Sequence, residues 1–123
     1  MLKSYKDLKT WQKSYELCLE IYKITKGFPK EEVYGLTSQI RRSAVSVPCN
    51  IAEGYGRKTT PEYIRSLYIA YGSTCELETQ ILLSGDLGYI GTEKLKKVQD
   101  EVGEVERMLK ALMKSLEDKP LNP

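Results

Sequence analysis

The last third of the chain carries an apolar repeat that few folds can accommodate. Its members recur at alternating intervals of three and four residues, in the order Leu95, Val98, Val102, Val105, Leu109, Leu112 and Leu116. Charged side chains occupy most of the positions between them. A helix with this spacing has one apolar stripe, and it must bury that stripe against other helices. The repeat therefore predicts a long helix from about residue 92 that packs in a bundle.

Two earlier segments also have helical spacing. The first runs from about residue 6 to 26 and ends at Gly27 and Pro29, which suit a helix terminus. One row at intervals of three or four is Leu8, Trp11, Tyr15, Cys18, Tyr22 and Thr25, and a second row beside it is Leu17, Ile21 and Ile24. The second segment follows Pro29, and its apolar row is Val33, Leu36, Ile40, Ala44, Val47 and Ile51. Pro48 lies inside this segment and predicts a kink there.

A further helix is predicted from Thr60, as its N-cap, to near Gly88, with Pro61 at its first position. Its buried row is Tyr63, Leu67, Ala70, Thr74, Leu77 and Ile81, and a second apolar row is Ile64, Tyr68, Tyr71, Cys75 and Leu82. Two rows exceed what one bundle contact covers. Four helices with short loops predict an all-α fold, an antiparallel up-down-up-down four-helix bundle. We expect one domain over residues 1–118 and a frayed tail over 119–123.

The composition argues against catalysis. The chain has no His, and its three cysteines lie far apart without a C-x-x-C pair. Metal sites in helical bundles use Glu-x-x-His motifs, and nucleophilic sites need a base beside the nucleophile. We therefore predict no catalytic residue, no metal, no cofactor and no enzymatic activity. The scattered cysteines, the absence of a signal-peptide pattern and the absence of a long apolar run predict a cytoplasmic protein that is not in a membrane.

Charge is distributed unevenly along the chain. The formal net charge is +2, yet residues 1–30 hold seven Lys against three acidic residues, and residues 61–91 hold one Arg against four. Lys6, Lys9 and Lys13 are spaced by three and four, which would place them in one row along a helix. Such a row can follow phosphates, with Tyr5 as a stacking platform. The candidate nucleic-acid contacts are these three lysines with Arg41, Arg42 and Arg57; a solvated helix face is the alternative for each lysine.

The second helix carries a polar row of Arg42, Ser46, Asn50, Glu53 and Arg57, with Arg41 beside it. Arg, Ser and Asn hydrogen-bond in defined geometry, unlike the mobile Lys and Glu of an ordinary solvated face. We favour a structural network that fixes helix register within the chain or between subunits. Its predicted members are Arg41, Arg42, Asn50, Glu53, Glu76 and Glu78. A ligand or nucleic-acid contact is the alternative.

Two stretches resemble a known family. Residues 34–54 are YGLTSQIRRSAVSVPCNIAEG, and residues 72–90 are GSTCELETQILLSGDLGYI. Together they closely resemble the four-helix-bundle proteins encoded by intervening sequences of bacterial 23S ribosomal RNA genes, and residues 7–29 fit that family's first helix. The resemblance implies a ring-shaped homopentamer. It also implies similarity to the accessory variability determinant proteins of diversity-generating retroelements, which are basic and work with a reverse transcriptase and RNA.

Two functional hypotheses follow. The first is a homo-oligomeric, non-enzymatic accessory protein that binds RNA or a nucleoprotein partner, such as a nucleic-acid enzyme. Its basis is the basic first helix together with the resemblance. The alternative is a purely structural or protein-interaction oligomer without a nucleic-acid role. Its basis is the second apolar row of the third helix and the nine tyrosines, which suit subunit contacts.

Overall fold

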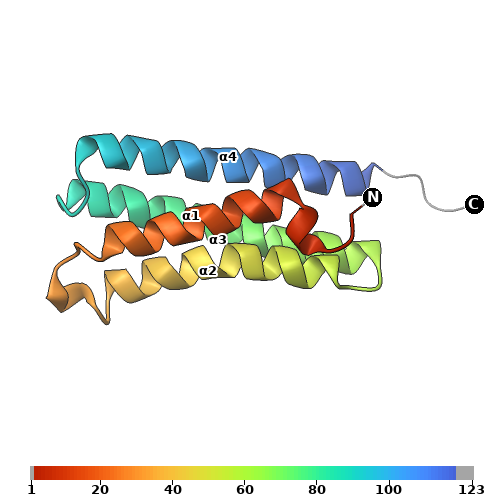
Figure 1. The fold of residues 1–123 in the computed structure, drawn as a ribbon, viewed down its shortest axis with the longest axis horizontal. Coiled ribbons are helices and arrows are strands. Elements are labelled where there is room, and N and C mark those ends of the chain that lie inside the picture. Colours follow the sequence, from red (N-terminus) through yellow and green to blue (C-terminus); the bar gives the residue numbers. More distant parts are fainter. Residues whose placement is uncertain (1, 119–123) are drawn as a thin grey trace, which may run out of the picture.

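The structure is a computed structural model that describes residues 2–118. It contains four long helices, α1 (Lys9–Thr25), α2 (Leu36–Tyr55), α3 (Thr60–Asp86) and α4 (Thr92–Glu117), and two short 3₁₀ helices, η1 (Tyr5–Asp7) and η2 (Lys30–Glu32). Residues 2–118 contain no strand, so the predicted all-α fold is confirmed. Consecutive helices run in opposite directions along one long axis (Figure 1). The predicted tail, 119–123, lies outside the described residues.

The helix starts differ from the predicted ones at three places. Lys6 belongs to η1 and not to α1, because Ser4 caps the 3₁₀ turn in a capping box with Asp7. Residues 30–32 form η2, and α2 begins only at Leu36, whose N–H donates to Glu32 Oε1 at 3.1 Å. The N-cap of α3 is Thr59, whose Oγ1 accepts from the N–H of Glu62 at 3.3 Å. The cap thus lies one residue before the predicted position.

The four helices bury one continuous apolar core. The predicted rows of α3 and α4 are largely confirmed, since the fully buried side chains include Leu67, Leu77, Ile81, Val98, Val102, Val105 and Leu109. The α2 row is buried from Ile40 to Ile51, whereas Val33 is exposed. On α1 the first predicted row is only partly buried. Thr25 is buried, and Leu8, Trp11 and Cys18 pack against the core, whereas Tyr15 and Tyr22 are exposed. The second predicted row, Leu17, Ile21 and Ile24, is buried in the core.

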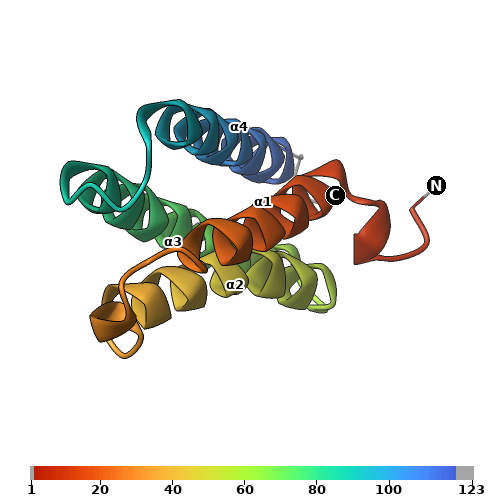
Figure 2. The same ribbon diagram turned by 60° about the vertical axis from the view of Figure 1, so that its left-hand side comes forward.

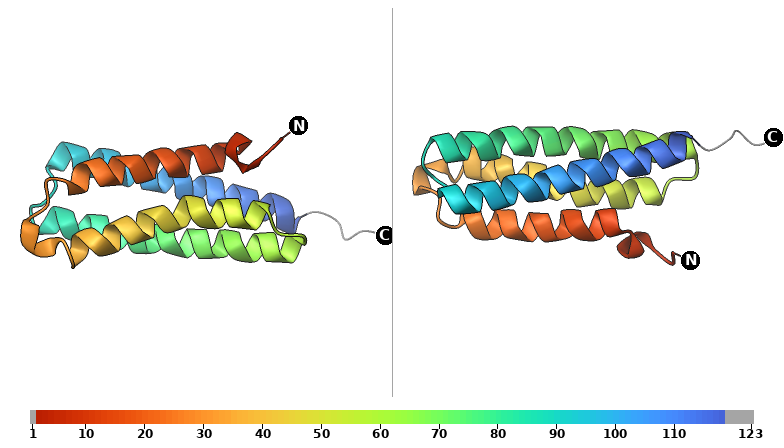
Figure 3. Two further views of the ribbon diagram at one scale, coloured as in Figure 1. Left: turned by 60° about the horizontal axis from the view of Figure 1, so that its bottom comes forward. Right: turned by 90° about the horizontal axis from the view of Figure 1, so that it is seen from above.

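The helices occupy the four corners of a bundle. Within residues 2–118, α1 packs against α2 and less extensively against α4, and α3 packs against α2 and α4. No Cα atom of α1 lies within 8 Å of one in α3, and none of α2 lies within 8 Å of one in α4. Figure 2 shows the crossing of the helices, and Figure 3 shows α1 and α3 on opposite sides with α2 and α4 between them. The outer faces of α1 and α3 therefore point away from each other.

Pro48 is buried within α2, which continues on both sides of it. Pro48 has no N–H to donate to Ala44, but one missing bond in a packed helix does not end it. The kink at Pro48 stays a prediction. Between residues 2 and 118, no helix is both long enough and apolar enough to cross a membrane.

Candidate functional site

The three candidate lysines do not form the predicted row. Lys6 lies in η1, so its position relative to α1 is not set by helical spacing, and that part of the prediction was wrong. Lys9 and Lys13 share α1. Lys13 Nζ lies 3.8 Å from Glu104 Oε1 of α4, in an exposed ion pair. Lys13 therefore lies toward α4, where acidic side chains are close by.

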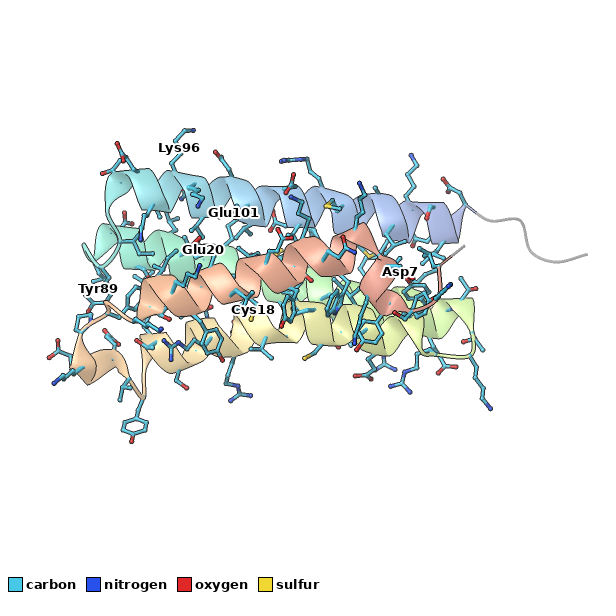
Figure 4. All side chains as sticks on the ribbon, in the orientation of Figure 1. Asp7, Cys18, Glu20, Tyr89, Lys96 and Glu101 are labelled. Atoms are coloured by element: carbon cyan, nitrogen blue, oxygen red, sulfur yellow. The ribbon has the colours of Figure 1, made fainter. Side chains whose placement is uncertain are left out.

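Glutamates accumulate along this α1–α4 seam. Lys97 of α4 pairs with Glu20 of α1 at 3.5 Å, and Figure 4 shows Glu20 and Glu101 at the neighbouring edges of the two helices. Glu101 Oε1 is buried without a hydrogen-bond partner in the described part of the chain. Burial raises the pKa of Glu101, and the nearby Glu20 and Glu104 raise it further, whereas Lys97 and Lys13 lower it. This seam is a poor place for a phosphate.

Arg41 lies on the other side of α1 from Lys13. Its Nε–H donates to Thr25 Oγ1 at 2.8 Å, and its Nη2 donates to the carbonyl oxygen of Tyr22 at 3.3 Å. Its guanidinium carbon also lies 4.6 Å from the centre of the Tyr22 ring, within cation–π range. Arg41 therefore ties α2 to the C-terminal turn of α1, where a cation is favoured by the helix dipole.

The predicted polar network divides into separate contacts. Asn50 Nδ2 donates to the Ser46 carbonyl at 2.8 Å, and the Ser46 hydroxyl lies 2.8 Å from that of Ser73 on α3. Glu53 pairs with Arg57 one turn later on the same surface. Among residues 2–118, no ion pair joins Arg41 or Arg42 to either predicted glutamate, Glu76 or Glu78.

Arg42 and Glu76 nevertheless line one groove between α2 and α3. Its other lining residues are Gln39, Ser43, Ser46 and Ser73, so the groove is mostly polar. Glu78 lies on the α4 side of α3, where its charge contributes to a raised pKa of Glu106, after the larger effect of burial. The structure thus brings Arg42 and Glu76 together and places Glu78 elsewhere.

Two adjoining grooves between α1 and α2 form a surface that the sequence analysis missed, here called the α1–α2 face. One is lined by Tyr5, Trp11, Tyr15, Cys18, Val45, Pro48, Cys49 and Ala52, and the other by Tyr22, Val33, Thr37, Ser38, Arg41, Arg42, Val45 and Ser46. None of these lining residues is Asp or Glu. The face therefore combines aromatic rings and arginines without a carboxylate.

Aromatic contacts order the first groove. The Trp11 ring stacks on that of Tyr15, with centroids 5.0 Å apart, and meets the Tyr5 ring edge-on at 5.3 Å. Tyr5, the predicted stacking platform, thus already packs against Trp11. Cys18 points toward α2 (Figure 4), and burial, then the nearby Cys49 thiol, raises its pKa. The sequence contained a signal for this face. On α1 a purely aliphatic row competes with the tyrosine row for burial in the core, and the row that loses stays at the surface.

A family model for the 23S rRNA-intervening sequence protein matches residues 6–111. The chain belongs to that family. This chain is similar to a crystal structure from Bacteroides thetaiotaomicron, which is of a protein of unknown function from the S23 ribosomal protein family. That similarity has a TM-score of 0.80 and 25% sequence identity, and covers 85% of this chain and 95% of the other. No curated protein sequence matches this member of the 23S rRNA-intervening sequence family.

Proposed function

We propose that the chain is a non-enzymatic accessory protein that assembles into a homo-oligomer, a pentamer by its family resemblance, and binds RNA in the assembled form. The observation that carries the assembly is a set of large apolar side chains exposed on opposite corners of the bundle. They are Tyr15, Leu19 and Tyr22 on α1, Ile69 and Leu83 on α3, and Leu87 at the C-cap of α3. Contiguous exposed apolar surface is characteristic of protein interfaces.

We expect RNA to bind the assembled form because one copy presents few cations to the phosphates. The net charge of one chain is +2, and its six basic candidates are divided among several surfaces, with Arg41 and Arg42 in one groove. Phosphate binding grows with the number of cations that contact the strand at once. Repeating the exposed Lys6, Lys9 and Arg42 around an oligomer would multiply weak contacts into useful affinity. We also propose a cytoplasmic location, which the three free cysteines support.

A second candidate is a purely structural or protein-interaction oligomer. It is favoured by the contacts of three of the six basic candidates, which are already engaged inside the chain. Lys13 pairs with Glu104, Arg57 pairs with Glu53, and Arg41 bonds to α1. On this interpretation the basic residues stabilise the fold and contact no phosphate.

The deciding experiment measures the native mass of the purified protein with and without nuclease treatment, then titrates it with structured RNA at increasing salt. The first candidate predicts an oligomer whose RNA affinity falls steeply as salt increases. An oligomer that does not bind RNA even at low ionic strength supports the second candidate and rules out the first. A protein that stays monomeric at every concentration contradicts both.

A further inference from the structure

The α1–α2 face carries two arginines whose charge no carboxylate balances there. The Arg41 side chain is held by neutral groups alone, through its bonds to Thr25 Oγ1 and the Tyr22 carbonyl and its position over the Tyr22 ring. Neither Arg41 nor Arg42 forms an ion pair with any residue between 2 and 118. Glu76 shares the separate groove between α2 and α3 with Arg42, without pairing with it. Two unpaired guanidinium groups in one groove favour an anionic ligand.

Exposed aromatic surface adjoins these arginines. Trp11 stacks on one side of the Tyr15 ring, with centroids 5.0 Å apart, yet Tyr15 remains 47% exposed. The groove beside these two rings has a volume of about 310 Å³ and is lined mostly by apolar side chains, such as Val45 and Pro48. This volume is at the lower end of the range for small-molecule sites, which suits one planar ring such as a nucleobase. Tyr15 therefore offers a stacking surface for a flat ligand.

The stacking surface and the arginines follow one another along the same two helices. Val45 borders both grooves of the α1–α2 face, so the two grooves meet there. Tyr15 of the aromatic groove and Tyr22 of the arginine groove are seven residues apart on α1, which is about 10 Å along the helix. A stacked strand advances about 3.4 Å per nucleotide, so about three nucleotides cover this distance. One strand can therefore stack a base on Tyr15 while its neighbouring phosphates reach the arginines.

We propose that the α1–α2 face binds a short segment of single-stranded RNA, with a base on Tyr15 and phosphates at Arg41 and Arg42. This assignment rests on the proposed RNA binding and adds the site and the form of the RNA. A single strand alternates negative charges with flat rings, as this face requires, whereas the bases of a duplex stack on each other and cannot reach Tyr15. The other exposed apolar side chains, such as Leu19 and Leu83, remain for subunit contacts.

Two substitutions of Tyr15 test the stacking contact. The probe is a fluorescein-labelled oligoadenylate RNA of about eight nucleotides, followed by anisotropy at low salt. We expect Tyr15→Leu to raise the dissociation constant about tenfold or more, and Tyr15→Phe, which keeps the ring, to change it less than about twofold. The matched control is Tyr68→Leu, because Tyr68 is 52% exposed on α3 and donates to Glu117 of α4. If Tyr15→Leu binds the RNA as tightly as Tyr68→Leu, no base stacks on Tyr15.

Arg42→Gln tests the phosphate contact, because Arg42 is exposed and makes no hydrogen bond that the substitution would remove in residues 2–118. Losing one phosphate contact to a single strand should reduce the slope of log affinity against log salt by about 0.7. Arg107→Gln is the matched control, since Arg107 is exposed on α4 and its loss changes the net charge equally. We expect Arg107→Gln to leave the slope unchanged. Equal effects of the two variants would mean that only net charge matters, and the site would be wrong.

The fluorescence of Trp11 reports on the site without any substitution, because Trp11 is the only tryptophan of the chain and lines the aromatic groove. A base that stacks on Tyr15 should quench this emission as the RNA binds. RNA that binds by anisotropy and leaves the Trp11 emission unchanged overturns the assignment. Equal quenching by a duplex of the same RNA would refute the stacking, and tighter binding of the corresponding single-stranded DNA, by about tenfold, would refute the assignment to RNA.

The remaining outcomes separate this inference from the proposed function. Far-UV circular dichroism verifies that each variant is folded, and sedimentation velocity compares its assembly with that of the unchanged protein. If Tyr15→Leu converts an oligomer to monomers, the α1–α2 face is a subunit contact, and the RNA site is refuted. If the unchanged protein and all the variants bind RNA with the same salt-sensitive affinity, only the site fails. If the unchanged protein binds no RNA at low ionic strength, the site and the proposed RNA binding fail together.

Discussion

Replacing Gly54 by Ala tests the closeness of α2 to α3. A Cβ at this position would lie 2.8 Å from Ser66 Cβ and 3.0 Å from Tyr63 Cδ1. Favourable carbon contacts are about 3.5–4.0 Å, so the helices must separate by roughly 0.7 Å or more. Overpacking of this kind costs about 1–3 kcal/mol, and the upper end applies because neither Cβ atom can rotate away. Ala recovers at most about 1 kcal/mol of helix propensity, which leaves a net loss of about 2 kcal/mol.

Gly103→Ala serves as the control for this prediction. Gly103 lies inside α4, and a Cβ there would meet only the tip of the Arg107 side chain, at 3.3 Å. That side chain can swing into solvent, so the substitution should stabilise the protein by about 0.5–1 kcal/mol. For a domain of this size 1 kcal/mol corresponds to about 4 °C in melting temperature.

The melting temperature should therefore fall by about 8 °C for Gly54→Ala and rise by about 2–4 °C for Gly103→Ala. Urea unfolding followed by circular dichroism gives the free energies, and it requires equal protein concentrations because assembly adds stability. A Gly54→Ala protein as stable as the unchanged one would refute the close approach of the two helices.

Three further substitutions test single contacts. Glu101→Gln removes a carboxyl with a buried oxygen and a raised pKa, so ionisation of Glu101 destabilises the folded state. The variant should therefore melt higher than the unchanged protein at pH 8. This gain should vanish below about pH 4, where the carboxyl is protonated in both the folded and the unfolded state. Arg41→Ala loses the hydrogen bonds to α1 and should lower the free energy of unfolding by about 1–2 kcal/mol in urea, whereas the exposed Arg42→Ala should change it little. Tyr89→Phe loses the 2.9 Å hydrogen bond to Glu32, which raises the pKa of Tyr89. The variant should melt lower at pH 7, and the deficit should shrink as the pH rises above the ordinary tyrosine pKa of about 10.

The sequence predicts α3 and α4 well and α1 poorly, for a physical reason. On α4 one apolar row alternates with charges, so only one side can face a core. On α1 two apolar rows lie side by side, and spacing alone does not rank them. Burial favours the row of Leu17, Ile21 and Ile24, because a tyrosine hydroxyl needs water or a partner. The tyrosines of the other row, Tyr15 and Tyr22, therefore remain at the surface.

The candidate site was predictable only in part, because spacing identifies residues that share a face and not the helix that the face meets. Arg41 and Arg42 are adjacent, yet Arg41 bonds to α1 and Arg42 lines a groove against α3. Glu76 and Glu78 are two residues apart, and they face α2 and α4, respectively. The packing of the helices thus places members of the predicted polar network on different surfaces.

Assembly and RNA binding are linked if RNA contacts basic residues that only an oligomer brings together, because the exposed apolar side chains hold the oligomer together. Leu83 contributes little to the stability of one chain, because about half of it stays in water. Leu83→Glu removes no cation, so a monomer that bound RNA by itself would lose little affinity. If binding depends on cations repeated around an oligomer, the same substitution should abolish both assembly and salt-sensitive RNA binding. Retention of RNA affinity by a monomeric Leu83→Glu protein would show that one copy suffices.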